Sequence, residues 1–320
     1  MIGYVAYATF FLVFVSIFAI AALGLNLQWG FTGQFNAGVV GFFAVGGYAL
    51  AILIGPVQPK LPDQVVHVSG LNLPFLVGLA GAVLVAAALA WVVGLATMRL
   101  RNDYLAITTF GIAITIHLVT INFESLTGGT LGLHSLPKPL ASILPTPFAF
   151  NLFFLMLTLS VLAGCYWALE RIVRSPWGRV LRAIREDDVA AIAVGKSADS
   201  FRLQAFVLGC ALMGLAGALY VAFIGYVSPF DFLPILTFQI WTMMIVGGSG
   251  NNRGAILGAF VVWGLWSLSG IIVSRWVPTV FQTQGGAIQV ILIGVVLVGS
   301  LLFRPRGLIG EEPRVSRHID

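Results

Sequence analysis

The sequence predicts an all-α, polytopic transmembrane helical bundle of about 8–10 spans with one helix outside the membrane. Of its 320 residues, 59% are apolar and only 9% are charged, whereas a soluble domain has about a quarter of its residues charged. The mean hydropathy is +0.99. Several apolar runs approach the length of about 20 residues that a helix needs to cross a bilayer. These observations exclude a soluble enzyme, a disordered chain and a nucleic-acid-binding module.

The apolar residues fall into nine runs, and each run is a candidate membrane segment. The runs cover residues 3–25, 37–54, 73–97, 104–121, 148–169, 201–226, 236–247, 254–273 and 287–303. The run at 236–247 has only about twelve residues, which favours a half-helix or part of a longer broken element. No Asp, Glu, Lys, Arg or His precedes Lys60, so the first run lacks the basic flank of a signal peptide and is expected to be a span. Residues 1–310 are expected to form one membrane domain, followed by a tail at 311–320.

The distribution of lysine and arginine predicts an orientation, because these residues gather in cytoplasmic loops. With nine spans, three basic residues fall on one side: Lys60, Lys138 and Arg275. The other side holds the remaining 14 of the 17 basic residues: Arg99, Arg101, Arg171, Arg174, Arg179, Arg182, Arg185, Lys196, Arg202, Arg253, Arg304, Arg306, Arg314 and Arg317. We therefore expect a cytoplasmic C-terminus and an N-terminus on the outer side. This topology explains the isoelectric point near 9.5 without a nucleic-acid partner.

Residues 175–195 form a predicted helix that must lie outside the bilayer. Ser175 suits the N-cap, Pro176 the first helical position and Gly195 the C-terminal end. Eight charged side chains fall within 171–188, and placing them in lipid would cost on the order of 20 kcal/mol. The helix is amphipathic, which fits either an interfacial helix on lipid phosphates or a docking helix for a cytoplasmic protein. Its apolar residues are Leu181, Ile184, Ala191 and Ile192, and its candidate docking residues are Arg179, Arg182, Arg185, Glu186, Asp188 and Gly195.

No catalytic or metal-binding constellation is recognisable in the sequence, so we expect no enzyme and no bound cofactor. Gly195-Lys196-Ser197 resembles the end of a phosphate-binding loop, but position 190 is Ala where that loop needs glycine. The chain is therefore not expected to hydrolyse ATP itself. Its two cysteines, Cys165 and Cys210, lie inside apolar runs, where they are expected to be core residues without a disulfide or metal.

Polar residues interrupt or border the apolar runs at three places. The glycine-rich segment 246–254 is expected to be a tight helix return first and a coupling contact second, and the other two places are candidates for a solute path. The segment at 26–36 between the first two apolar runs is rich in amides and glycine, and it fits either a broken helix lining a path or a short cytoplasmic turn. Its candidates are Asn26, Gln28, Gln34 and Asn36. In the fourth run the candidates are Thr108, Thr109 and His117. His117 fits either a neutral side chain bonded to a neighbouring helix or a proton relay. So few intramembrane charges argue against ion coupling and indicate that another polypeptide supplies the energy.

Taken together, the motifs resemble the LivM-type permease of the branched-chain amino-acid ABC importers along nearly the whole chain. The resemblance is carried by Gly24-Leu25-Asn26-Leu27 with Gly30, Gly33, Asn36 and Gly38, by residues 99–107 (RLRNDYLAI), 125–129 (SLTGG), 175–179 (SPWGR), Ala205-Phe206, 214–220 (GLAGALY), 247–250 (GGSG) and 303–308 (FRPRGL).

The resemblance implies a heteromer with a second permease subunit, two cytoplasmic ATPase subunits that bind the ATP, and a periplasmic substrate-binding protein. It implies an amino-acid substrate and a multi-pass protein of the bacterial inner membrane, in contact with lipid. Permeases of ABC importers carry a cytoplasmic Glu-Ala-Ala-x-x-x-Gly loop; Ala190, Ala191 and Gly195 match it, whereas Val189 replaces the Glu. The alternatives are a permease for urea or amides and an ion-coupled secondary transporter.

Overall fold

The computed structural model describes residues 2–56, 70–97, 100, 102–140, 146–276, 285–304 and 306–311. The helices are α1 (Ile2–Thr32), α2 (Val39–Ile54), α3 (Phe75–Thr97), α4 (Asn102–Asn122), α5 (Glu124–Thr127), α6 (Pro147–Arg174), α7 (Pro176–Glu186), α8 (Asp188–Ala193), α9 (Ala198–Ile224), α10 (Pro234–Gly247), α11 (Asn252–Trp276) and α13 (Gly285–Phe303), with 3-10 turns η1 (Gly129–Leu131) and η2 (Pro229–Phe232). Across these residues the fold is helical, which confirms the predicted all-α class. Lys60, Arg99, Arg101, Pro305, Arg314 and Arg317 lie outside the described residues.

All nine apolar runs fold as helices, but they differ in length. Among the described residues, seven helices are long and apolar enough to cross a membrane: α1, α3, α4, α6, α9, α11 and α13. The other two, α2 and α10, have 16 and 14 residues, fewer than the roughly 20 that a crossing needs. The short length of α10 was predicted from its short apolar run. The run at 37–54 was not predicted to be short, but α2 is shorter than a full span.

An extended segment between α1 and α2 explains why α2 is short. At the end of α1, a Cβ on Gly33 would lie 3.2 Å from Cγ of Arg185 in α7, so the chain has reached the α7 end of the bundle. Residues 33–38 are not helical. Asn36 already lies beside Cys210, midway along α9, with Nδ2 3.7 Å from its Sγ. The chain thus re-enters the bundle without a helix, and α2 forms only the half of this crossing that lies away from the α7 end.

α10 completes the arrangement as the half-helix nearer the α7 end. The backbone N–H of Val40, in the first turn of α2, donates to Oγ1 of Thr237 in the first turn of α10 at 3.1 Å. The turn after α10 reaches the α7 end, where a Cβ on Gly250 would lie 3.4 Å from Nη1 of Arg185. The N-termini of the two half-helices therefore meet inside the bundle.

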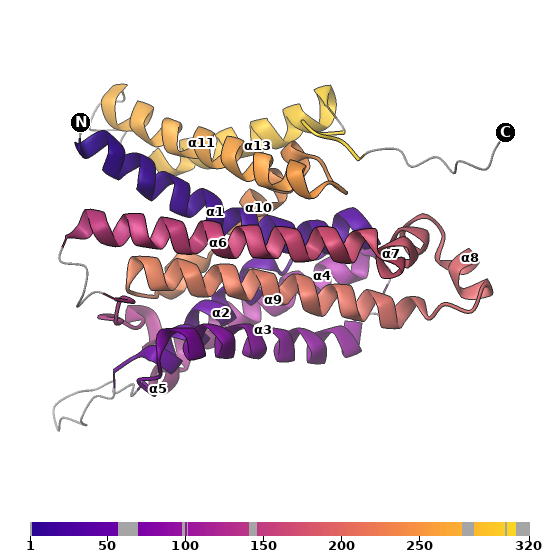
Figure 1. Ribbon diagram of the computed structural model, residues 1–320, viewed down its shortest axis with the longest axis horizontal. Helices are drawn as coiled ribbons and strands as arrows, with labels where there is room; N and C mark the ends of the chain where they lie inside the picture. The colour runs from indigo at the N-terminus through magenta and orange to yellow at the C-terminus, as the bar shows by residue number, and fades with distance from the viewer. Residues whose placement is uncertain are drawn as a thin grey trace.

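Glycine contacts bring the central helices together around α9. A Cβ on Gly46 of α2 would lie 2.0 Å from the carbonyl oxygen of Gly214, and a Cβ on Gly24 of α1 would lie 2.5 Å from that of Gly209. Small residues allow membrane helices to approach to backbone contact. Of the seven long helices, α1 is the most buried and α13 the least, and Figure 1 shows α13 at the edge of the bundle.

The end of the bundle that carries α7 and α8 (Figure 1) is rich in basic residues, because the end of α6, the start of α9, the start of α11 and the segment after α13 also lie there. The described members of this group are Arg171, Arg174, Arg179, Arg182, Arg185, Lys196, Arg202, Arg253, Arg304 and Arg306. Lys138 lies instead at the opposite end, with Nζ 5.1 Å from the ring centroid of Phe150 in the first turn of α6. The grouping is the one that the orientation rule for membrane proteins predicts.

Candidate translocation and coupling site

Two amides at the end of α1 connect this helix to distant parts of the chain. The fully buried Asn26 donates from Nδ2 to Oδ1 of Asn252 at 3.0 Å and accepts the backbone N–H of Gly250 at 2.8 Å. Gln28, also fully buried, donates from Nε2 to the carbonyl of Phe206 in α9 at 2.8 Å. The end of α1 is therefore tied both to the turn after α10 and to α9.

Two further amides hold the extended segment that follows. Asn36 donates to Oε1 of Gln28 at 2.9 Å and accepts the backbone N–H of Gly38 at 2.8 Å. Gln34 donates to the carbonyl of Arg202 at 3.1 Å. The four amides predicted as path residues are thus at most 1% exposed and bonded to the protein. In this conformation the amides supply hydrogen-bond partners for backbone groups at and around the helix break, which lipid could not do.

Side chains from three segments cap the N-terminus of α2. Asn36 accepts the N–H of Gly38, Thr237 accepts that of Val40, and Oγ1 of Thr109 accepts the N–H of Ala37 at 3.0 Å. The first N–H groups of a helix have no partner within the helix, and in broken transporter helices they can bind an anionic solute group. Of the three N–H groups bonded here, that of Val40 belongs to α2, whereas Ala37 and Gly38 precede its first residue, Val39.

Three aromatic rings pack beside the break. Phe35 stacks on Trp241 of α10 with ring centroids 4.4 Å apart, and Trp29 lies edge-on to both at 5.3 and 5.4 Å. Trp241 also donates from Nε1 to the carbonyl of Asn36 at 3.0 Å. The rings therefore pack the end of α1 and the extended segment against α10.

The other predicted path residues lie on α4. Thr109 is buried at the α2 cap, whereas Thr108 and His117 are half-buried. The buried Nδ1 of His117 has no hydrogen-bond partner among the described residues. α4 also exposes Thr115 and Asn122 and has the lowest mean hydropathy of the seven candidate spans, 1.8. Both polar groups bond to carbonyls of α4 itself, which lowers their cost in an apolar environment, and the apolar Ile107, Leu118 and Val119 are exposed on the same helix.

The predicted helix at 175–195 is divided into α7 and α8 at Asp187. This residue adopts an extended conformation, and its Oδ1 accepts the N–H of Ala190 at 3.0 Å as the N-cap of α8. The sequence predicted one helix with its ends at Ser175 and Gly195, and this internal cap at Asp187 was not predicted. The outer limits agree with the sequence: Pro176 is the first residue of α7, and Gly195, with φ of +81°, follows α8.

α7 and α8 expose different chemistry. α7 buries Leu181 and Ile184 against the bundle and exposes Arg179 and Glu186. α8 buries only Ala191. Its exposed aliphatic side chains are Val189, Ile192 and Val194, at 73%, 56% and 74%. Ile192 was expected on the buried face but is exposed. The break at Asp187 gives α8 a different direction from α7, so the face expected for one continuous helix does not extend into α8.

An ion pair holds α8 against the N-terminal part of α9. Nη2 of Arg202 lies 3.1 Å from Oδ2 of Asp188. The carbonyl of the same Arg202 accepts the hydrogen bond from Gln34, so α8 is linked through one residue to the segment that re-enters the bundle.

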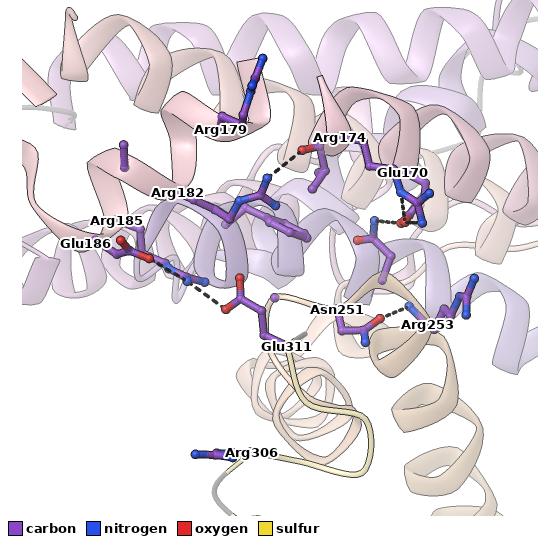
Figure 2. Close-up of a pocket in the computed structure, with 15 residues that line it drawn as sticks. Glu170, Arg174, Arg179, Arg182, Arg185, Glu186, Asn251, Arg253, Arg306 and Glu311 are labelled. Carbon is purple, nitrogen blue, oxygen red and sulfur yellow. Dashed lines mark hydrogen bonds and ion pairs between the residues drawn. The ribbon is translucent and has the colours of Figure 1, made fainter. Parts of the chain in front are cut away.

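A cavity of about 730 Å³ opens between the end of α6, α7, the turn after α10 and the C-terminal segment. Its charged lining residues are Arg174, Arg179, Arg182, Arg185, Arg253 and Arg306, with Glu170, Glu186 and Glu311. Figure 2 shows Arg185 directed toward Glu311, and their Nη2 and Oε2 atoms are 2.9 Å apart. Arg185 also donates from Nη1 to the carbonyl of Gly30, and Arg182 donates to that of Val173 at 3.4 Å. These two arginines of α7 therefore engage the chain itself.

The family model for the permease component of the branched-chain amino acid transport system matches residues 7–301. The chain belongs to this family. The family is one of ABC transport permeases, not enzymes, and this permease is a multi-pass membrane protein.

Two LivM proteins are among its relatives. The permease is 30% identical to the high-affinity branched-chain amino acid transport system permease protein LivM of Salmonella typhimurium, over 92% of this chain and 68% of that protein. It is 28% identical to the probable branched-chain amino acid transport permease protein LivM of Methanocaldococcus jannaschii, over 95% and 94% of the two chains. The permease protein LivH of Escherichia coli is 24% identical, over 91% and 92%. No solved structure matches.

The sequence did not single out several residues that build this site of the permease. Thr237 and Trp241 lie in an apolar run, and their roles depend on α2, about 200 positions away. Asn252 also donates to Oε2 of Glu170 in α6 at 3.0 Å. Glu311 had been assigned to the tail. The sequence features that pointed to this part of the site were the glycines of the 247–250 segment and the 303–308 motif, and the structure brings these two segments together.

Proposed function

We propose that this permease forms half of the translocation path of an ABC importer for branched-chain or related amino acids, beside a second permease subunit. Two cytoplasmic ATPase subunits and a periplasmic substrate-binding protein complete the assembly. It lies in the inner membrane with the α7 end and the C-terminus in the cytoplasm. The names of relatives such as LivM of Salmonella typhimurium support this solute class. The proposal depends most on one observation: hydrogen bonds tie the chain just before α2 to the arginine-rich end, from Arg185 to the carbonyl of Gly30 and from Gln34 to the carbonyl of Arg202.

The solute path follows α4 and the helix breaks. An amino-acid zwitterion must desolvate two charges, so its path needs polar partners. The half-buried Thr108 and His117 of α4 supply such groups, and the unpartnered Nδ1 of His117 supports this role. The amides Asn26, Gln28, Gln34 and Asn36, with Thr109, are bonded within the chain in this conformation. They become available to the solute when α2 and α10 separate.

The ATPase contact is centred on α8 and flanked by the polar face of α7. Exposed aliphatic side chains grouped at one site are typical of protein interfaces, and α8 presents Val189, Ile192 and Val194. Arg179 and Glu186 flank them, Asp188 anchors α8 through Arg202, and Gly195 allows the chain to turn toward α9. ATP-driven closure of the ATPases would shift α8 and α7 and change the populations of inward- and outward-open states.

Deleting the gene and measuring uptake of radiolabelled solutes tests the proposal. We expect the loss of leucine, isoleucine or valine uptake while urea uptake stays at the parental level. Loss of urea uptake alone would instead support the urea and amide alternative. Uptake by the purified chain in vesicles under an ion gradient, without ATPase subunits, would contradict the ABC mechanism and favour a secondary transporter.

A further inference from the structure

The C-terminal segment 306–311 lies along the end of α10. The backbone N–H of Leu308 donates to the carbonyl of Val246 at 2.8 Å, and that of Ile309 donates to the carbonyl of Gly247 at 3.0 Å. The last carbonyls of a helix lack partners within the helix, so the segment supplies the C-terminal cap of α10. Asn251 adds a third bond, from Nδ2 to the carbonyl of Gly310 at 3.2 Å.

This contact is made backbone to backbone, and glycines make it possible. A Cβ on Gly248 would lie 2.3 Å from the carbonyl oxygen of Ile309, and a Cβ on Gly307 would lie 2.4 Å from Cα of Gly248. Both glycines also have positive φ, +115° and +70°, which side chains disfavour. The glycines of the 247–250 and 303–308 motifs therefore fit one another.

At its far end the segment reaches α7. Glu311 accepts a hydrogen bond from Nη2 of Arg185 at 2.9 Å, as Figure 2 shows. The other terminal nitrogen of Arg185 donates to the carbonyl of Gly30, near the end of α1. Side-chain exposure is 25% for Arg185 and 34% for Glu311. One guanidinium thus joins α7, the end of α1 and the segment that caps α10.

We infer that residues 306–311 act as a strap and that Arg185 is a positioning residue that transmits movement of α7 to both half-helices. A displacement of α7 pulls the carbonyl of Gly30, where the chain enters the break before α2. The same displacement pulls Glu311 and, through the strap, the end of α10. α2 and α10 therefore respond together. This inference extends the proposed function, because it depends on an ATPase moving α7.

Glu311→Gln in the complete complex tests the strap, since it removes the charge but keeps the size of the side chain. We expect normal assembly and ATP hydrolysis, but about three- to tenfold less solute transported per ATP hydrolysed. Arg185→Lys should lower this ratio similarly, because one ammonium cannot reproduce the two-sided guanidinium contact. Arg171→Gln is the matched control: it removes an exposed charge at the same end of the bundle, whose guanidinium lies 5.1 Å from the ring centroid of Trp167 in the same helix, and should leave the ratio unchanged. An unchanged ratio in Glu311→Gln would overturn the inference.

Hydrogen exchange on the purified chain tests the same contact without transport. Glu311→Gln should make the amides of Leu308 and Ile309, and those near Gly30, exchange roughly two- to fivefold faster. Unchanged exchange at both places would also overturn the strap, even if the variant fails to assemble. Failure of the proposed function would give a different result, because the wild-type complex itself would show no ATP-driven transport. The hydrogen-exchange experiment would still test the strap in that case.

Discussion

Two regions hold the half-helices of this permease by opposite chemistry. Inside the bundle, the break before α2 is held by neutral amides that are at most 1% exposed. At the α7 end, the contact between Arg185 and Glu311 uses full charges that remain partly exposed. A buried polar group without a partner costs several kcal/mol, whereas an exposed ion pair can exchange its partner for water at little cost. The inner region is therefore suited to fix the break, and the outer region to be released and re-formed.

The largest effect should come from removing one amide of the break. Asn36→Leu leaves the N–H of Gly38 and Oε1 of Gln28 buried without their partner, which should lower the free energy of unfolding by about 2–4 kcal/mol. Thermal or denaturant unfolding of the purified protein in detergent measures this loss. Asn122→Leu is the matched control, because Asn122 is exposed on α4 and bonds only to the carbonyl of Leu118. Equal losses in the two variants would show that the break does not depend on its amides.

A smaller loss should follow from disturbing the glycine contact at the outer region. Gly248 has φ of +115° and ψ of +114°, and a non-glycine residue there costs about 1–3 kcal/mol. Gly248→Ala should therefore destabilise the protein and expose the strap to proteases. Gly299→Ala in α13 is the control, since a Cβ there meets nothing within 4 Å. If Gly248→Ala unfolds like the wild type and its strap stays protected, the strap is not packed on Gly248.

Properties that depend on local composition could be predicted from the sequence. The nine apolar runs gave nine helices, because each run is apolar enough to specify a helix by itself, although α2 and α10 are shorter than a full span. Amides and glycines interrupt the apolar sequence at 26–36, which predicted either a broken helix or a short turn; α1 continues to Thr32, and the non-helical part is 33–38. The exclusion of 175–195 from the bilayer followed from its charges. Each of these conclusions requires only neighbours along the chain.

The partners of the site residues could not be predicted, because they come from distant segments. Asn26 bonds to Asn252, and Arg185 bonds to both Gly30 and Glu311. Nothing in the local sequence distinguishes an arginine directed at a partner protein from one directed at a carbonyl of its own chain. For the same reason, the amides of the break resembled solute ligands before their bonds within the chain were visible.

The smallest effect should separate the two regions by their response to salt. At low ionic strength, Glu311→Gln should cost less than about 1 kcal/mol of stability, because the pair with Arg185 is partly exposed. At about 1 M salt, where the screening length is near 3 Å, most of that difference should vanish. The loss in Asn36→Leu should stay constant, since neutral amides carry no net charge to screen. Unfolding midpoints of the two variants and the wild type at both salt concentrations measure this. A salt-insensitive loss in Glu311→Gln would mean that Glu311 acts as a buried hydrogen-bond acceptor, like the amides of the break, and that the outer region is as fixed as the inner one.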